Sequence, residues 1–211
     1  MDEVKLFRAA AALVSLYAVI VGAALAWLVQ QPLLVFEGAV EGWVSLLAYR
    51  VYAFEKPVEV SGFDSLILPG AVLLAYSLLL VATAALVLAK IYGGWGPRLG
   101  RAVEAFTGVA LASMPALAFL RGVSILIFWE ERFLARSYTY ETSAGVIKLG
   151  KASAHLTPAG QVLLGAPMMA ALAVLGVAAM VLLVLYWAAA EMSVVEEEVE
   201  PGDEDIGAGP E

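Results

Sequence analysis

Four long stretches of this chain contain almost no charge, and they constrain its fold more than any other feature. They are residues 9–29, 66–89, 105–129 and 159–190, and only Arg121 interrupts them. A helix needs about 20 apolar residues to cross the hydrocarbon core of a bilayer, because it rises ~1.5 Å per residue. Lipid offers no partner to a backbone N–H or C=O group, so such runs should be helical. The sequence therefore predicts an all-α integral membrane protein, a four-helix transmembrane bundle.

The fourth stretch is longer than one crossing needs. Thr157 and Pro158 form a good helix start, because a threonine hydroxyl accepts a free N–H and proline in the first turn loses no hydrogen bond. We expect residues 158–166 to protrude, with a kink at Gly165-Ala166-Pro167. The fourth span then covers residues 168–190, and the other three spans match their charge-free stretches.

Composition excludes several classes of protein. Hydrophobic residues make up 62% of the chain and charged residues 15%, whereas a soluble domain has ~45–50% and ~25%. Of the 20 acidic residues, nine follow residue 190, where there is no Lys or Arg. The rest of the chain is almost balanced in charge, so we expect no nucleic-acid partner. The absence of cysteine excludes disulfides and thiolate chemistry.

The last part of the chain, residues 191–211, combines those nine acids with proline and glycine. Such a segment cannot bury a core, and we expect a disordered acidic C-terminal tail. The chain also lacks asparagine and has three glutamines. Scarcity of thermolabile residues is typical of hyperthermophile proteins, and we expect a thermophilic, archaeal source.

Basic residues favour one orientation. The N-terminus carries Lys5 and Arg8, and the short link 90–104 carries three more basic residues. Cytoplasmic loops are enriched in Lys and Arg, so we predict a multi-pass protein of the cell membrane with both termini in the cytoplasm. The loops 30–65 and 130–158 also contain basic residues, but these are spread over longer segments.

Both long loops should then face outward. In the first, apolar residues of segment 38–54 recur near helical spacing, which predicts an amphipathic helix on the membrane or on a neighbour. Residues 57–60 suggest a short extended piece. In the second loop, segments 137–142 and 146–151 are rich in β-formers and flank a short turn, which predicts a β-hairpin. We expect this hairpin to pack near Val58.

Small residues recur every four positions within the predicted spans. Ala18, Gly22 and Ala26 do so in the first span, and Gly108 and Ala112 do so in the third. Small residues let helix backbones approach closely in lipid. We expect these faces to bind other helices, in a protein partner or a homo-oligomer. The alternative is that an alanine-rich chain produces such spacings by chance.

Arg121 is the candidate functional charge. Within a span over 105–129 it would lie inside the membrane, where a charge is costly and indicates a function. With a span ending near residue 122, it would instead lie at the outer interface, followed by an interfacial helix. Glu37 and Glu41, one helical turn apart at the outer end of the first span, are candidate partners of Arg121.

The remaining residues that carry chemistry are few. His155 is the only histidine, and without cysteines or a compact carboxylate group we expect no metal site and no cofactor. No Asp or Glu lies within a span, which disfavours proton pumps and ion-coupled carriers. No enzyme motif is present, so we expect no catalysis. Gly93 and Gly94 begin a glycine-rich turn. Pro115 should kink the third helix.

Segment 78–120 resembles the middle of Yip1-domain proteins. The matching residues are the glycines at 93, 94 and 96, the arginines at 98 and 101, and Ser113-Met114-Pro115. The resemblance covers roughly a fifth of the chain. It implies a non-enzymatic integral membrane protein linked to membrane organisation or trafficking, and it implies no catalytic residue. The four spans found here differ from the five typical of that family.

The sequence thus favours a non-catalytic polytopic membrane protein that acts as a structural or accessory subunit. The alternative is a small oligomeric channel or the membrane subunit of a transporter. That alternative requires a polar lumen, for which the candidate residues are Ser15, Tyr17, Tyr76, Ser77, Thr83, Thr107 and Ser113.

Overall fold

The computed structural model describes residues 3–53, 56–93, 99–134, 137–142 and 145–199. Its helices are α1 (Glu3–Gln30), α2 (Ser61–Tyr92), α3 (Leu99–Leu111), α4 (Ser113–Leu134), α5 (Pro158–Leu164) and α6 (Ala166–Val199). Its strands are β1 (Leu34–Gly38), β2 (Val40–Val44), β3 (Tyr49–Ala53), β4 (Lys56–Pro57), β5 (Ser137–Thr142) and β6 (Gly145–Leu156).

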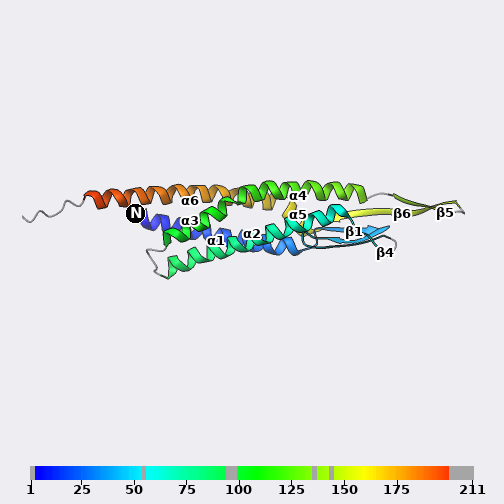
Figure 1. Cartoon of the computed structure of the whole chain (residues 1–211), viewed down its shortest axis with the longest axis horizontal. Helices are drawn as coiled ribbons and strands as arrows, with labels where there is room; N and C mark the ends of the chain where they lie inside the picture. Colours follow the sequence, from blue (N-terminus) through cyan, green and yellow to red (C-terminus); the bar gives the residue numbers. More distant parts are fainter. Residues whose placement is uncertain (1–2, 54–55, 94–98, 135–136, 143–144, 200–211) are drawn as a thin grey trace, which may run out of the picture.

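Four helical segments are long and apolar enough to span a membrane, as predicted. They are Lys5–Gln30, Gly62–Tyr92, Leu99–Arg132 and Pro158–Ala188. Helix α1 packs against α2 and α6, and the α3–α4 segment packs against the same two helices, so the four segments form a closed ring. All helices follow the long axis of the molecule, with the sheet at one end and the N-terminus and the end of α6 at the other (Figure 1).

Glycines mark the closest approaches between helices. A Cβ on Gly22 of α1 would lie 2.8 Å from Cγ2 of Val81 in α2. A Cβ on Gly176 of α6 would lie 2.7 Å from Cε of Met114 in α4. The predicted contact at Gly22 is therefore made within the chain. A Cβ on Gly108 of α3 would meet no atom within 4 Å, so this position is open.

The helix boundaries follow local chemistry. The Thr157 hydroxyl accepts the Gly160 N–H at 3.1 Å, Pro158 starts α5, and the chain breaks at Gly165, as predicted. The third segment breaks at Ala112, between α3 and α4. Pro115 has no N–H for the carbonyl of Leu111, which explains the position of this break. Helix α6 continues to Val199, into the predicted tail, and residues 200–211 lie outside the described part.

The strands form a single antiparallel sheet in the order β4-β3-β2-β1-β6-β5. The predicted hairpin is present as β5 and β6, with Ser137 opposite Lys151; residues 143–144 of its turn lie outside the described residues. Strand β1 joins the two loops, because it pairs with β6 from Leu34 opposite Leu156 to Gly38 opposite Ala152. The expected packing near Val58 is wrong, since β4 lies at the far edge of the sheet.

The predicted amphipathic helix over 38–54 is also wrong, because this segment forms β2 and β3. Its apolar residues fit helical spacing only in part, and the sheet uses their alternation with polar residues. Gly38 and Gly42 have φ of 102° and 143°, which L-residues rarely adopt. A Cβ on Gly42 would collide with the Arg50 carbonyl of β3. Glycine is therefore the residue that fits the backbone conformation at both positions.

The inner face of the sheet packs against helix α2. The ring of buried Phe63 lies 6.0 Å from that of Phe36 in β1 and 5.7 Å from that of Tyr49 in β3. Two turns further along, Gly70 is buried, and a Cβ there would collide with the Leu46 carbonyl. The backbone of the β2–β3 turn therefore rests directly on the helix.

We expect Gly70→Ala to destabilise the fold. The added methyl group would push the Leu46 backbone away from α2, and overpacking of this kind costs about 1–3 kcal/mol. The midpoint of thermal unfolding in detergent should fall. Gly108→Ala is the matched control, since its methyl group enters open space and alanine favours a helix by about 0.5–1 kcal/mol over glycine. Equal midpoints for the two variants would contradict this account of Gly70.

Candidate interaction surface

One face of the sheet packs on the helices and the other is open. Alternate strand residues point to opposite faces, and the buried side chains of Phe36, Val40 and Val51 belong to the inner face. The opposite side, here called the outer face, carries charged and aromatic side chains. These include Glu37, Glu41, Trp43, Arg50, Tyr52 and His155, all of them exposed or half-buried.

The register places these residues in rows across the strands. Trp43 of β2 lies opposite Val35 of β1 on one side and opposite Arg50 of β3 on the other. In the next row, Glu41 lies opposite Tyr52. Directly opposed side chains in an antiparallel pair are close enough to interact. The outer face therefore presents an aromatic centre with acids and a cation beside it.

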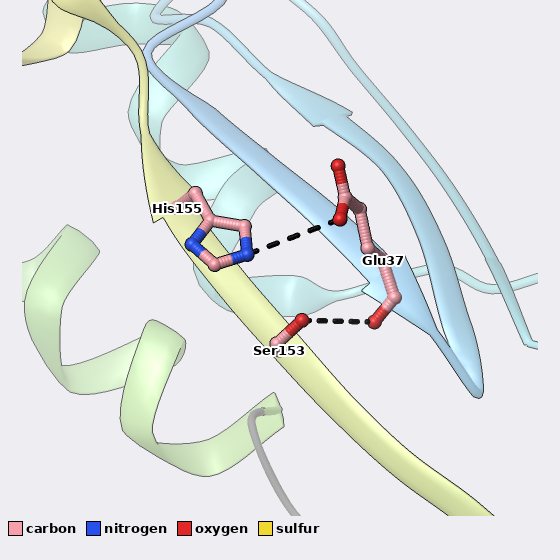
Figure 2. A network of polar contacts seen from close by, with 3 residues as sticks. All are labelled: Glu37, Ser153 and His155. Carbon is pink, nitrogen blue, oxygen red and sulfur yellow. Dashed lines mark hydrogen bonds and ion pairs between the residues drawn. The ribbon is translucent and has the colours of Figure 1, made fainter.

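Figure 2 shows the polar contacts of Glu37 at the β1–β6 boundary. His155 Nε2 lies 3.9 Å from Glu37 Oε2, and the two side chains are 63% and 69% exposed. The Ser153 hydroxyl donates to the backbone carbonyl of Glu37 at 3.4 Å. An exposed pair at this distance contributes about 1 kcal/mol at most. The open face and its side chains thus remain available for other contacts.

Glu37 and Glu41 do not lie one helical turn apart, because they belong to neighbouring strands. Both point to the outer face, since Glu37 alternates with Phe36 and Glu41 with Val40. Arg121 lies on α4, where its side chain is exposed. Among the described residues, no ion pair joins Arg121 to either acid. The structure therefore brings the two predicted acids together and leaves the predicted arginine apart.

The predicted glycine turn falls mostly outside the described residues. Gly93 ends α2 by donating its N–H to the Ala89 carbonyl at 2.8 Å, whereas Gly94 lies in the segment that the structure does not describe. His155 is exposed, as predicted. Within the described ranges, no group of three His, Cys, Asp or Glu side chains could hold a metal ion.

The hydroxyl groups proposed for a polar lumen bond mainly to backbone carbonyls. Ser77 donates to the Leu74 carbonyl at 2.7 Å, Thr107 to Val103 at 2.8 Å and Thr83 to Leu79 at 2.9 Å. The hydroxyl of Tyr17 instead joins α1 to α6, by donating to the Ala171 carbonyl at 3.1 Å. Four of the seven hydroxyls are thus satisfied by backbone carbonyls. The other three, Ser15 Oγ, Tyr76 OH and Ser113 Oγ, are buried and have no hydrogen-bond partner in the described part of the chain.

Tyr49 fixes the corner between the sheet and α2. Its hydroxyl donates to Asp64 Oδ1 at 2.9 Å and accepts the Val60 N–H at 3.3 Å. Burial raises the pKa of Tyr49, and the negative charge of Asp64 adds to this effect, while the Val60 N–H opposes it. The neutral phenol is therefore the form that the fold favours.

Sequence reasoning found the acids of the outer face but not the face itself. The face depends on pairing between β1 and β6, which are far apart in the chain. Alternation of Leu34 and Phe36 with exposed Glu37, followed by two glycines, was the local signal for strands. The chain matches no protein family, no curated protein sequence and no solved structure, so the surface is interpreted from its geometry alone.

We expect Tyr49→Phe to lower the free energy of unfolding by about 1 kcal/mol, because it removes the hydrogen bond to Asp64. The difference from the wild type should be present below pH ~10, the usual pKa of tyrosine. It should shrink at higher pH, because ionising the wild-type phenol beside Asp64 is unfavourable in the folded state. Unfolding followed from neutral to alkaline pH tests this. A difference that grows above pH ~10 would contradict the role given to Tyr49.

Proposed function

We propose that this protein crosses the cell membrane four times and acts as a non-catalytic structural or accessory subunit, with the outer face as its partner-binding surface. The supporting observation is the arrangement of charge along the molecule. One end of the bundle carries basic residues on α1, α2 and α3 and the acids at the end of α6. The other end carries the sheet, and the region between them has no charge except at its edges.

The length of the charge-free region suits a bilayer. From Arg8 to Gln30, α1 covers ~33 Å, and from Glu104 to Arg121 the α3–α4 segment covers ~25 Å. The hydrocarbon core is ~30 Å thick. Exposed aromatic side chains lie near both limits, with Trp27 at the sheet end and Trp187 and Tyr92 at the other, as is typical of membrane interfaces.

The orientation follows from the basic residues of α1, α2 and α3. Lys5, Arg8, Lys90 and Arg101 all lie at the end opposite the sheet. By the positive-inside rule this end is cytoplasmic, which directs the sheet outward. Phe7 and Tyr186 have ring centroids 6.1 Å apart, so α1 and α6 share that end, and both termini belong to the cytoplasmic side.

The accessory role is supported by where the structure places its polar groups. Charged and aromatic side chains are concentrated on the outer face, whereas four of the seven candidate lumen hydroxyls donate to backbone carbonyls. The hydroxyls of Ser15, Tyr76 and Ser113 have no partner among the described residues, and a channel or transporter subunit would need more free hydroxyls than these three to line a path. The open position at Gly108 offers a second contact for a protein partner or a second copy within the membrane.

The absence of cysteine makes topology directly testable. We expect Glu41→Cys to react with a membrane-impermeant maleimide added outside intact cells or right-side-out vesicles. Arg101→Cys should react only after the membrane is permeabilised. Leu78→Cys, whose side chain is exposed at mid-helix, should react in neither case because lipid covers it. External labelling of Arg101→Cys would overturn the proposed orientation, and ready labelling of Leu78→Cys would overturn membrane insertion.

The binding surface is tested by placing a photo-crosslinking amino acid at Tyr52, with Leu78 as the control position. We expect Tyr52 to crosslink a protein that also co-purifies in stoichiometric amount. The double charge reversal Glu37→Lys and Glu41→Lys should weaken the affinity for that protein at least tenfold. This corresponds to about 1.4 kcal/mol of binding free energy. The double variant should change thermal unfolding little, since both acids are exposed and the Glu37–His155 pair contributes about 1 kcal/mol at most. Retention of the partner by this variant would contradict the assignment of the outer face.

A further inference from the structure

Arg121 points away from the bundle. Leu120, Val123 and Ser124 are buried on the inward side of α4, whereas Ala118, Arg121 and Gly122 lie on its exposed side. Residues three or four positions apart share one face of a helix. A Cβ on Gly122 would meet no atom within 4 Å. The guanidinium therefore extends from an open helix face, and it has no hydrogen-bond or ion-pair partner among the described residues.

Contacts with α2 fix the level of Arg121 along the molecule. At the sheet end, a Cβ on Gly62 of α2 would collide with the Glu130 carboxylate of α4. Arg121 lies nine residues before Glu130, and Gly70 lies eight residues after Gly62. The two helices run in opposite directions, so these steps of ~13 Å and ~12 Å lead to the same level. Gly70 is where the sheet rests on α2, so Arg121 lies at the boundary between the charge-free region and the sheet.

This level also matches the end of α1. Helix α1 ends at Gln30, and three residues later the Leu33 N–H donates to the Val44 carbonyl at 2.7 Å, beside the β2–β3 turn that rests on Gly70. The Leu33 carbonyl would collide with a Cβ on Gly160 at the start of α5. The chain from the first span and the chain entering the fourth therefore meet at the limit of the charge-free region. Figure 1 shows α4 continuing beyond this limit alongside the sheet. Arg121 is thus a cation at the outer edge of the proposed membrane region, on a side that faces lipid.

A guanidinium in this position needs an anionic partner. Arginine presents several N–H donors in a planar arrangement that matches the oxygens of a phosphate group. At the outer edge of the hydrocarbon region, the anions at hand are the phosphates of lipid headgroups. We propose that Arg121 forms a binding site for the phosphate of a membrane lipid in the outer leaflet. This inference rests on the membrane insertion proposed above.

The test compares lipids that co-purify with the protein after reconstitution into phosphatidylglycerol vesicles and gentle extraction. Native mass spectrometry should show phosphatidylglycerol bound to the wild type. Arg121→Gln should lower the bound fraction by about tenfold, as expected for loss of a charge-assisted hydrogen bond. Arg121→Lys should retain part of the binding, because it keeps the charge without the planar donors. A vesicle of phosphate-free galactolipid should show no difference between wild type and Arg121→Gln.

Arg132→Gln is the matched control. It removes an exposed arginine from the same helix, eleven residues and ~16 Å further from the charge-free region. We expect it to bind phosphatidylglycerol as the wild type does. Equal loss in both variants would overturn the site, because it would show a general effect of positive charge.

Three further outcomes would overturn the proposal. Equal lipid binding by wild type and Arg121→Gln would remove Arg121 from the site. Displacement of the lipid by an excess of inorganic phosphate would assign the site to free phosphate instead of a headgroup. Release of an acidic protein partner by Arg121→Gln, with lipid binding unchanged, would assign the arginine to a protein interface. In each case the maleimide labelling of Glu41→Cys, Leu78→Cys and Arg101→Cys would still test membrane insertion separately.

Discussion

The contact between α2 and the inner face of the sheet determines how everything outside the charge-free region is placed. Phe63 fills the space between Phe36 and Tyr49, and Gly70 allows the helix and the Leu46 backbone to touch. Because α2 continues into the bundle without interruption, the sheet is held by a rigid element instead of a loop. Burial of a phenylalanine side chain is worth about 1.5–3 kcal/mol, so Phe63 contributes strongly to this attachment. The orientation of the outer face depends on it.

The four helical segments could be predicted because the signal is local. A charge-free run of sufficient length has one regular way to satisfy its backbone in an apolar environment. The hairpin of β5 and β6 could be predicted for the same reason, since alternation and a short turn lie within 20 residues. Segment 38–54 could not, because Trp43, Leu46 and Val51 recur near helical spacing, although Leu46 lies in the turn between β2 and β3. The deciding contact, between β1 and β6, joins residues more than 100 positions apart.

The candidate surface shows the same difference between local features, which could be predicted, and long-range contacts, which could not. The sequence identified Glu37 and Glu41 as unusual charges near a predicted helix end, which the structure places on one face of the sheet. It assigned them to a helix, so their relation to His155, Trp43 and Arg50 could not be found. His155 illustrates the reason. Its contact with Glu37 requires the register of two strands from different loops, and no local pattern encodes a register of that kind.

The distribution of hydrogen-bonding groups bears on the choice between the two functional classes that the sequence left open. Moving a solute through the bundle would require unpaired polar groups along a continuous path. Ser77 and Thr107 donate to carbonyls of their own helices, and Tyr17 uses its hydroxyl to join α1 to α6. The hydroxyls of Ser15, Tyr76 and Ser113 are buried and unpaired among the described residues. Glycines bring α1 close to α2 and α4 close to α6. The charged and aromatic groups that could recognise another molecule lie on the sheet, and Arg121 lies where the sheet begins. This arrangement supports a bundle that anchors and orients a recognition surface.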